Sequence, residues 1–166
     1  GVEFRFRSGG EDWIASWHSP AQSPPGGTPH GSAAICFSLD REVVLVSSDG
    51  ATWEVPGGRP EVHEDFRATL DREISEEACA RIERASLLGF SKGTCMSGPE
   101  EGLVLVRSLW CAVVSLREWA PRHEMNYRRL VPSCVAIEQL DSPVGLRSIY
   151  RRWFGEALGI FPALSR

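Results

Sequence analysis

The chain has 166 residues, a length that fits one domain with its own hydrophobic core. Its hydrophobic content of 42% and charged content of 24% are ordinary for a globular protein. No apolar run reaches the roughly 20 residues of a membrane-crossing helix, so we expect no membrane partner. A net charge of −4 argues against a broad basic surface for duplex nucleic acid.

The five cysteines are odd in number, lie far apart and form no CxxC pair. No pattern of basic residues followed by an apolar run, typical of a signal peptide, opens the sequence. We therefore expect a cytoplasmic protein with reduced, mostly buried thiols rather than a disulfide framework.

The first part of the chain predicts strands separated by turns. Apolar and polar residues alternate around Gly9-Gly10, which predicts an N-terminal hairpin, and residues 18–32 are a loop rich in Pro, Gly and Ser. We expect a single domain over residues 1–166, in which residues 1–31 form an N-terminal extension. This extension is a candidate lid or a candidate dimer element, and in the second case the protein would be a homodimer. Strands are expected over residues 33–39, 43–47 and 52–55, and Pro56-Gly57-Gly58 should break the last of these.

The second part predicts a central helix, more strands and a C-terminal helix. Apolar residues at every fourth position from Phe66 predict a helix over about residues 65–80. Strands should follow at residues 85–90, 102–116 and 130–137, with loops at 92–101 and 117–127. Ser142-Pro143 can start the last helix. This order indicates an α/β (α+β) fold in which helices cover both faces of a mixed sheet.

The negative charge is concentrated in one segment. Residues 61–84 hold eight acidic and four basic side chains, and the rest of the chain is neutral. On a helix, Glu73, Glu76 and Glu77 share one face. A solvated helix face is the ordinary explanation of such a cluster. Oxygen ligands without His or Cys instead suit a hard cation, Mg²⁺ or Mn²⁺.

Residues 57–80 resemble the Nudix box, in which a glycine, a glutamate and an Arg-Glu-aliphatic-any-Glu-Glu run stand at fixed spacing. The matching positions are Gly58, Glu64, Arg72, Glu73, Ile74, Glu76 and Glu77. Two positions depart, because Cys79 replaces a glycine and Ala80 is a weak final aliphatic. The preceding WEVPGG is similar to the approach strand of the MutT-like branch. The resemblance implies a Nudix-type α/β/α sandwich with the catalytic helix directly after a loop.

The change at position 79 concerns the end of the helix. A glycine there supplies either a positive φ angle or close packing. Cysteine fits a packing role and would be strained at positive φ, so we expect tight packing at Cys79.

The resemblance also implies an activity, the metal-dependent hydrolysis of a nucleoside diphosphate linked to a further group. Glu73, Glu76 and Glu77 would hold Mg²⁺ (or Mn²⁺) together with the carbonyl of Gly57. Arg72 would orient a neighbouring carboxylate. Glu76 and Glu73 would then act with Arg72 as catalytic residues while water attacks phosphorus.

The general base is either a helix glutamate or a carboxylate of a late loop. Glu124 is the candidate in that loop and Glu118 the second, and a plain surface role is the alternative for Glu124. Trp119 is a candidate for stacking on a base, and Arg122 and Arg128 for binding substrate phosphates. Core packing and a solvated strand end are the alternatives for these three.

The substrate is less defined than the reaction. The proline typical of ADP-ribose hydrolases is missing at Thr94-Cys95, and the tyrosine typical of diadenosine polyphosphate hydrolases is missing at Met96-Ser97. The MutT-like approach favours a nucleoside triphosphate or related small nucleotide, with nucleotide sugars and ADP-ribose as alternatives. A non-catalytic nucleotide-binding or regulatory domain of the same fold, a non-hydrolytic enzyme and an interaction module also remain open.

Overall fold

The computed structural model describes residues 2–21, 23–142 and 144–166, and within them eight strands form one mixed sheet. The strands are β1 (Glu3–Ser8), β2 (Glu11–His18), β3 (Thr28–Phe37), β4 (Glu42–Ser47), β5 (Gly57–Gly58), β6 (Ala80–Cys95), β7 (Val104–Leu116) and β8 (Tyr127–Pro132). The helices are α1 (Phe66–Ala78), α2 (Ser133–Gln139), the 3-10 turn η1 (Val144–Leu146) and α3 (Arg147–Leu164).

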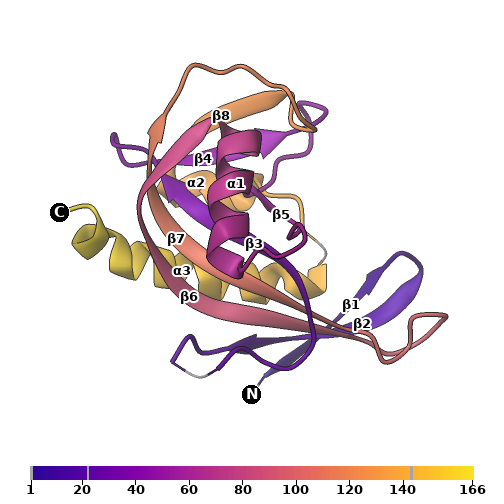
Figure 1. The fold of residues 1–166 in the computed structure, drawn as a ribbon. Helices are drawn as coiled ribbons and strands as arrows, with labels where there is room; N and C mark the ends of the chain where they lie inside the picture. The colour runs from indigo at the N-terminus through magenta and orange to yellow at the C-terminus, as the bar shows by residue number, and fades with distance from the viewer. Residues whose placement is uncertain (1, 22, 143) are drawn as a thin grey trace.

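The sheet is built around two long strands, β6 and β7, which curve along much of the molecule (Figure 1). The strand order is β1-β2-β6-β7-β3-β4-β8, and β5 pairs with β3 outside this path. Strands β3 and β7 run parallel, and every other described pair is antiparallel. Helix α1 covers one face and α3 the other, as expected from the alternation of strands and helices (Figure 1).

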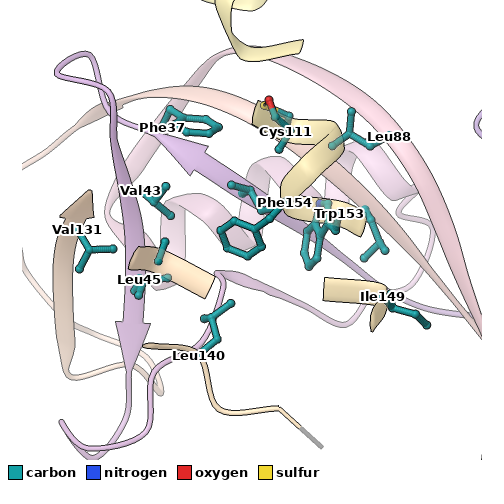
Figure 2. Close-up of a cluster of buried hydrophobic side chains, with 14 of the residues drawn as sticks. Phe37, Val43, Leu45, Leu88, Cys111, Val131, Leu140, Ile149, Trp153 and Phe154 are labelled. Atoms are coloured by element: carbon teal, nitrogen blue, oxygen red, sulfur yellow. Dashed lines mark hydrogen bonds between the residues drawn. The ribbon is translucent and has the colours of Figure 1, made fainter. Parts of the chain in front are cut away.

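Alternate residues of the central strands build two separate cores. Phe37 of β3 and Leu45 of β4 point to the face where Trp153 and Phe154 of α3 pack (Figure 2). Their sequence neighbours point the other way, toward Leu70 and the rest of the apolar stripe of α1. A strand buried on both faces needs apolar residues at consecutive positions, which the runs AAICF and VVLV provide.

Helix α1 begins and ends at defined caps. The Asp65 side chain accepts a hydrogen bond from the backbone N–H of Ala68 at 2.7 Å. At the other end Cys79 adopts the left-handed conformation, with φ 50° and ψ 50°. Our expectation that position 79 needs only tight packing was therefore wrong. The chain turns directly from α1 into β6 at Ala80, and that reversal requires a positive φ at a buried thiol.

Several elements differ from the sequence-based expectation. Strand β3 begins at Thr28, inside the expected loop, because β7 pairs with this segment. Residues 133–139 form helix α2 rather than a strand, since a short apolar run does not distinguish the two. Gly57-Gly58 does not only end a strand but pairs with β3 as β5, and residues 52–55 form isolated bridges. The expected helix start at Ser142-Pro143 includes Pro143, which lies outside the described residues.

The predicted N-terminal hairpin is present as β1 and β2, and β2 extends the sheet through β6. Strand β1 also contacts η1, where Gly145 lies so close to the backbone of Arg5 that a Cβ would overlap it. The cysteines are free thiols, and Cys134 is exposed. None of the described helices is long and apolar enough to cross a membrane.

Candidate active site

A cavity of about 940 Å³ opens beside β5, the short strand that lies next to α1 (Figure 1). One part of its wall is acidic, with Glu73, Glu76 and Glu77 from α1 and Glu124 from the loop after β7. The two glycines of β5 line it as well. Its opposite part lies under α3 and is lined by aromatic and aliphatic side chains.

Glu77 is the most deeply buried of these carboxylates. It is 6% exposed and accepts a hydrogen bond from the backbone N–H of Gly57 at 2.9 Å. Burial raises the pKa of its carboxyl group to about 8, although the Gly57 N–H opposes this shift. The charges of Glu73, Glu54 and Glu124 raise the pKa further. Burial and these neighbouring charges therefore favour the protonated form of Glu77.

Glu73 lies against Gly58. A Cβ atom at position 58 would overlap its carboxylate, so a larger residue there would displace the end of the Glu73 side chain. Burial raises the pKa of Glu73, while the hydrogen bond from Arg72, 2.8 Å from Nη1 to Oε1, lowers it. The fixed spacing from Gly58 to Glu73 in the sequence thus corresponds to a direct contact.

Arg72 links the acidic residues of the segment. It donates to both Glu64 oxygens at 2.8 and 2.9 Å, and to the backbone carbonyl of Arg59 at 2.8 Å. It also reaches Glu76 at 3.2 Å. The hydrogen bond from Arg72 is the largest cause that lowers the pKa of Glu64 to about 2. Arg72 therefore ties the loop after β5 to α1 and offsets part of the repulsion along the helix.

The donor set suits a divalent cation in its chemistry. Glu73, Glu76, Glu77 and Gly57 offer carboxylate and backbone oxygens, and within the residues that the structure describes the buried Glu77 forms no salt bridge. In the described part of the chain, no three His, Cys, Asp or Glu side chains converge tightly enough to form a ready metal cluster. Both Glu73 and Glu76 direct a carboxylate oxygen onto Arg72, at 2.8 and 3.2 Å.

The late-loop carboxylates lie at different places. Glu124 lines the main cavity, and its charge acts on Glu73 and Glu77. Glu118 instead lines a separate pocket of about 340 Å³ behind Glu76, together with Arg122. Of the two candidates for the general base, the structure brings only Glu124 to the cavity.

The three candidate substrate-binding residues lie away from the main cavity. Arg128 donates to the carbonyls of Ala78, Cys79 and Arg117 at 2.9, 3.3 and 3.0 Å, and so caps the C-terminus of α1. Its guanidinium lies 5.3 Å from the centre of the Trp119 ring. Neither Trp119 nor Arg128 lines the main cavity, and Arg122 lines the smaller pocket.

Sequence reasoning missed a group of basic residues in the cavity, His30, Arg59 and Arg107. His30 lies in a segment that we expected to be a loop. A signal was available for Arg107, because it is the single charge within the apolar run LVLVRSLW. The aromatic residues Phe6, Trp13, Tyr150 and Trp153, which line the wall under α3, were also not assigned to the site.

Comparison with known proteins agrees with this architecture. The Bacillus subtilis pyrophosphohydrolase BsRppH is similar over 96% of this chain and 97% of its own, with a TM-score of 0.72 and 20% identity. MutT from Aliivibrio salmonicida or Vibrio cholerae matches 78% of this chain and 99% of its own (TM-score 0.54, 15% identity). A C. elegans Ap4A hydrolase matches 80% of this chain and 98% of its own (TM-score 0.55, 15% identity). These identities establish the shared fold alone.

No curated protein sequence matches the chain significantly. The sequence profile of the NUDIX domain, in contrast, matches residues 28–152, which is more than half of the chain. This match covers strands β3 to β8 and the acidic helix α1, and the hairpin of β1 and β2 lies outside it. The chain therefore belongs to the Nudix family.

Proposed function

We propose that the protein is a metal-dependent pyrophosphohydrolase that cleaves a diphosphate linkage in a nucleoside diphosphate derivative, with a nucleoside triphosphate as the first substrate to test. The observation that carries the proposal is the convergence of Glu73 and Glu77 on the backbone of Gly57 and Gly58 at the wall of a large cavity. The family membership supports the same class of reaction.

Glu73, Glu76, Glu77 and the backbone of Gly57 are the groups that would hold Mg²⁺ or Mn²⁺. When bound, the cation polarises a phosphoryl oxygen and lowers the pKa of a water molecule. The protein itself contributes by holding these carboxylates in fixed positions. The Gly57 N–H fixes Glu77, and Arg72 fixes Glu73 while joining it to Glu64.

Glu124 takes the proton from the attacking water in this proposal, because it is the late-loop carboxylate at the cavity. A helix glutamate is the alternative base. The apolar wall under α3 excludes water from the far end of the cavity and accommodates the base of the nucleotide.

The decisive experiment is a substrate panel with Mg²⁺, Mn²⁺ or EDTA. It covers canonical and oxidised nucleoside triphosphates, dinucleoside polyphosphates, ADP-ribose and nucleotide sugars, with phosphate and pyrophosphate release as the readout. We expect metal-dependent release from at least one nucleotide.

Two amide variants test the residues. Glu76→Gln and Glu77→Gln should each abolish most turnover while the protein stays folded, because glutamine at 77 still accepts from the Gly57 N–H. Glu138→Gln, at an exposed position on α2, is the matched control. Full turnover in both site variants would refute the proposal, and nucleotide binding without any release would favour a non-catalytic binding domain.

A further inference from the structure

Three basic side chains come together where three strands lie side by side. The parallel pairing of β3 and β7 places Gly31 beside Arg107, and the pairing of β3 and β5 places Ser32 beside Gly58, one residue before Arg59. The register of β3 shifts between Pro29 and Gly31, so His30 is the extra residue of a bulge. Bulges redirect side chains, and His30, Arg59 and Arg107 all line the main cavity.

These arginines differ from the other arginines at the site. Arg72 forms ion pairs with Glu64 and Glu73, and Arg128 donates to three carbonyls. The side chains of Arg59 and Arg107 form no salt bridge and no hydrogen bond with any residue that the structure describes (2–21, 23–142 and 144–166). Both are therefore available to a ligand.

The electrostatics of the cluster favour an anion. Burial lowers the pKa of Arg107, and the charge of Arg59 lowers it further. Burial also lowers the pKa of His30 to about 4, with Arg107 and Arg59 as the next causes. Arg59 and Arg107 thus repel one another, and together with burial they keep His30 neutral, a form in which one ring nitrogen still donates a hydrogen bond. Glu54 and Tyr150 act on Arg107 in the opposite direction, and Glu54 is the one carboxylate among these influences.

The cluster also lies between two chemically different parts of the cavity. Gly58 precedes Arg59 and touches the Glu73 carboxylate, so the acidic wall begins next to the cluster. On β7, Arg107 is two residues before Leu109 and shares its face of the sheet, which packs under α3. Arg59 is thus next to the acidic wall in sequence, and Arg107 is on the side of the sheet that bears the apolar wall.

We infer that His30, Arg59 and Arg107 bind the polyphosphate of the substrate, between its nucleoside under α3 and the phosphorus attacked at the glutamates. This inference rests on the proposed function for the identity of the substrate. Phosphate oxygens accept hydrogen bonds from guanidinium groups in pairs, and such charge-assisted bonds are strong in a partly desolvated site. A neutral or singly charged ligand has too few acceptor oxygens to pair with the donors of all three residues.

Binding of inorganic tripolyphosphate in EDTA tests the cluster without metal and without turnover. We would titrate the full chain by calorimetry at low ionic strength and compare Arg107→Met, Arg107→Lys and Arg59→Gln with the wild type. Arg107→Met and Arg59→Gln should each weaken tripolyphosphate binding about tenfold or more. The affinity of Arg107→Lys should lie between those of Arg107→Met and the wild type, since lysine keeps the charge but not the paired guanidinium donors. Arg151→Gln, on the exposed side of α3, is the control and should bind like wild type.

Thermal unfolding of each variant guards against a simple loss of fold. If Arg107→Met does not fold, Arg59→Gln decides, because Arg59 is exposed in a loop. Unchanged tripolyphosphate affinity in the folded variants, or no binding by the wild type, overturns the inference. That result would not contradict the proposed hydrolysis of a nucleotide, which the substrate panel tests separately. Conversely, tripolyphosphate binding that depends on both arginines, without hydrolysis of any substrate, supports this site and rejects the proposed function.

Kinetics adds a second readout if hydrolysis is found. Arg107→Met should raise KM for a nucleoside triphosphate more than it lowers kcat, because the cluster holds phosphates that do not react. An equal fall of kcat and kcat/KM would contradict the assignment of Arg107 to binding.

Discussion

The carboxylate of Glu73 lies directly on Gly58, fifteen residues earlier in the chain, and leaves no room for a methyl group between them. The spacing of this glycine and this glutamate in the chain therefore has a direct structural meaning. It also makes the acidic wall sensitive to a change that adds no charge.

Gly58→Ala should displace Glu73 and lower kcat about 100-fold, because small misplacements of catalytic groups cost factors of this size. Steady-state kinetics with the identified nucleotide, together with a thermal unfolding curve, measures the effect. Gly26→Ala is the matched control, since nothing lies within 4 Å of a Cβ at that position. Normal turnover in Gly58→Ala would show that Glu73 is not needed in this position.

Arg72 should contribute to stability as well as to the site. Arg72→Gln leaves Glu64, Glu73 and Glu76 without their shared partner, and we expect a loss of about 2 kcal/mol in the free energy of unfolding. Urea denaturation in EDTA gives the value. Arg67→Gln, which removes an exposed pair with Asp71, should cost less than about 1 kcal/mol. Equal effects of the two substitutions would contradict the linking role of Arg72.

Cys79 offers a test of backbone conformation. At its φ of 50° glycine is unstrained and alanine is not. Cys79→Gly should therefore be more stable than Cys79→Ala by about 1 kcal/mol, although both lose the buried thiol. Denaturant midpoints of the two variants measure this difference directly. A more stable alanine variant would mean that packing, not the left-handed angle, decides this position.

His30 should make stability depend on pH. Its pKa falls from 6.5 to about 4 on folding, so the unfolded chain binds the proton more readily. The stability that neutral His30 contributes is present above pH 6.5 and is lost as the pH falls toward 4. The unfolding free energy of the wild type minus that of His30→Gln should thus decrease between pH 7 and pH 5. His63→Asn, at an exposed position, is the control, and a constant difference for His30→Gln would refute the prediction.

Sequence reasoning was most successful where a pattern has one physical solution. The apolar residues at every fourth position from Phe66 to Ala78 specify α1, and the alternation around Gly9-Gly10 specifies the hairpin. Helix α2 was not predicted, since an apolar run of seven residues fits a strand or a helix. The bulge at His30 was missed because it depends on pairing with β7, far along the chain.

The same distinction holds for the candidate site, where residues placed by local spacing were predicted and residues placed by strand pairing were not. Apart from Glu124, the acidic wall comes from one continuous segment, and local spacing places Glu73 and Glu77, for which we propose catalytic roles, next to the β5 glycines. The basic cluster comes from β3, β7 and the loop after β5, and no local pattern reveals the register that brings them together. Trp119 was attractive because it lies in a polar loop, and Arg128 because it flanks that loop, but Arg128 caps α1 from β8 and its guanidinium lies over the Trp119 ring.

Strand β3 has a consequence for how the molecule acquires its shape. It pairs with β4 and β5 nearby in sequence, but its parallel partner β7 lies far along the chain. Contacts of large sequence separation form slowly, because a long loop must close before they stabilise anything. The hairpin and α1 depend on local contacts, whereas His30, Arg59 and Arg107 meet only after β7 docks. During refolding, secondary structure should therefore recover before the capacity to bind polyphosphate does.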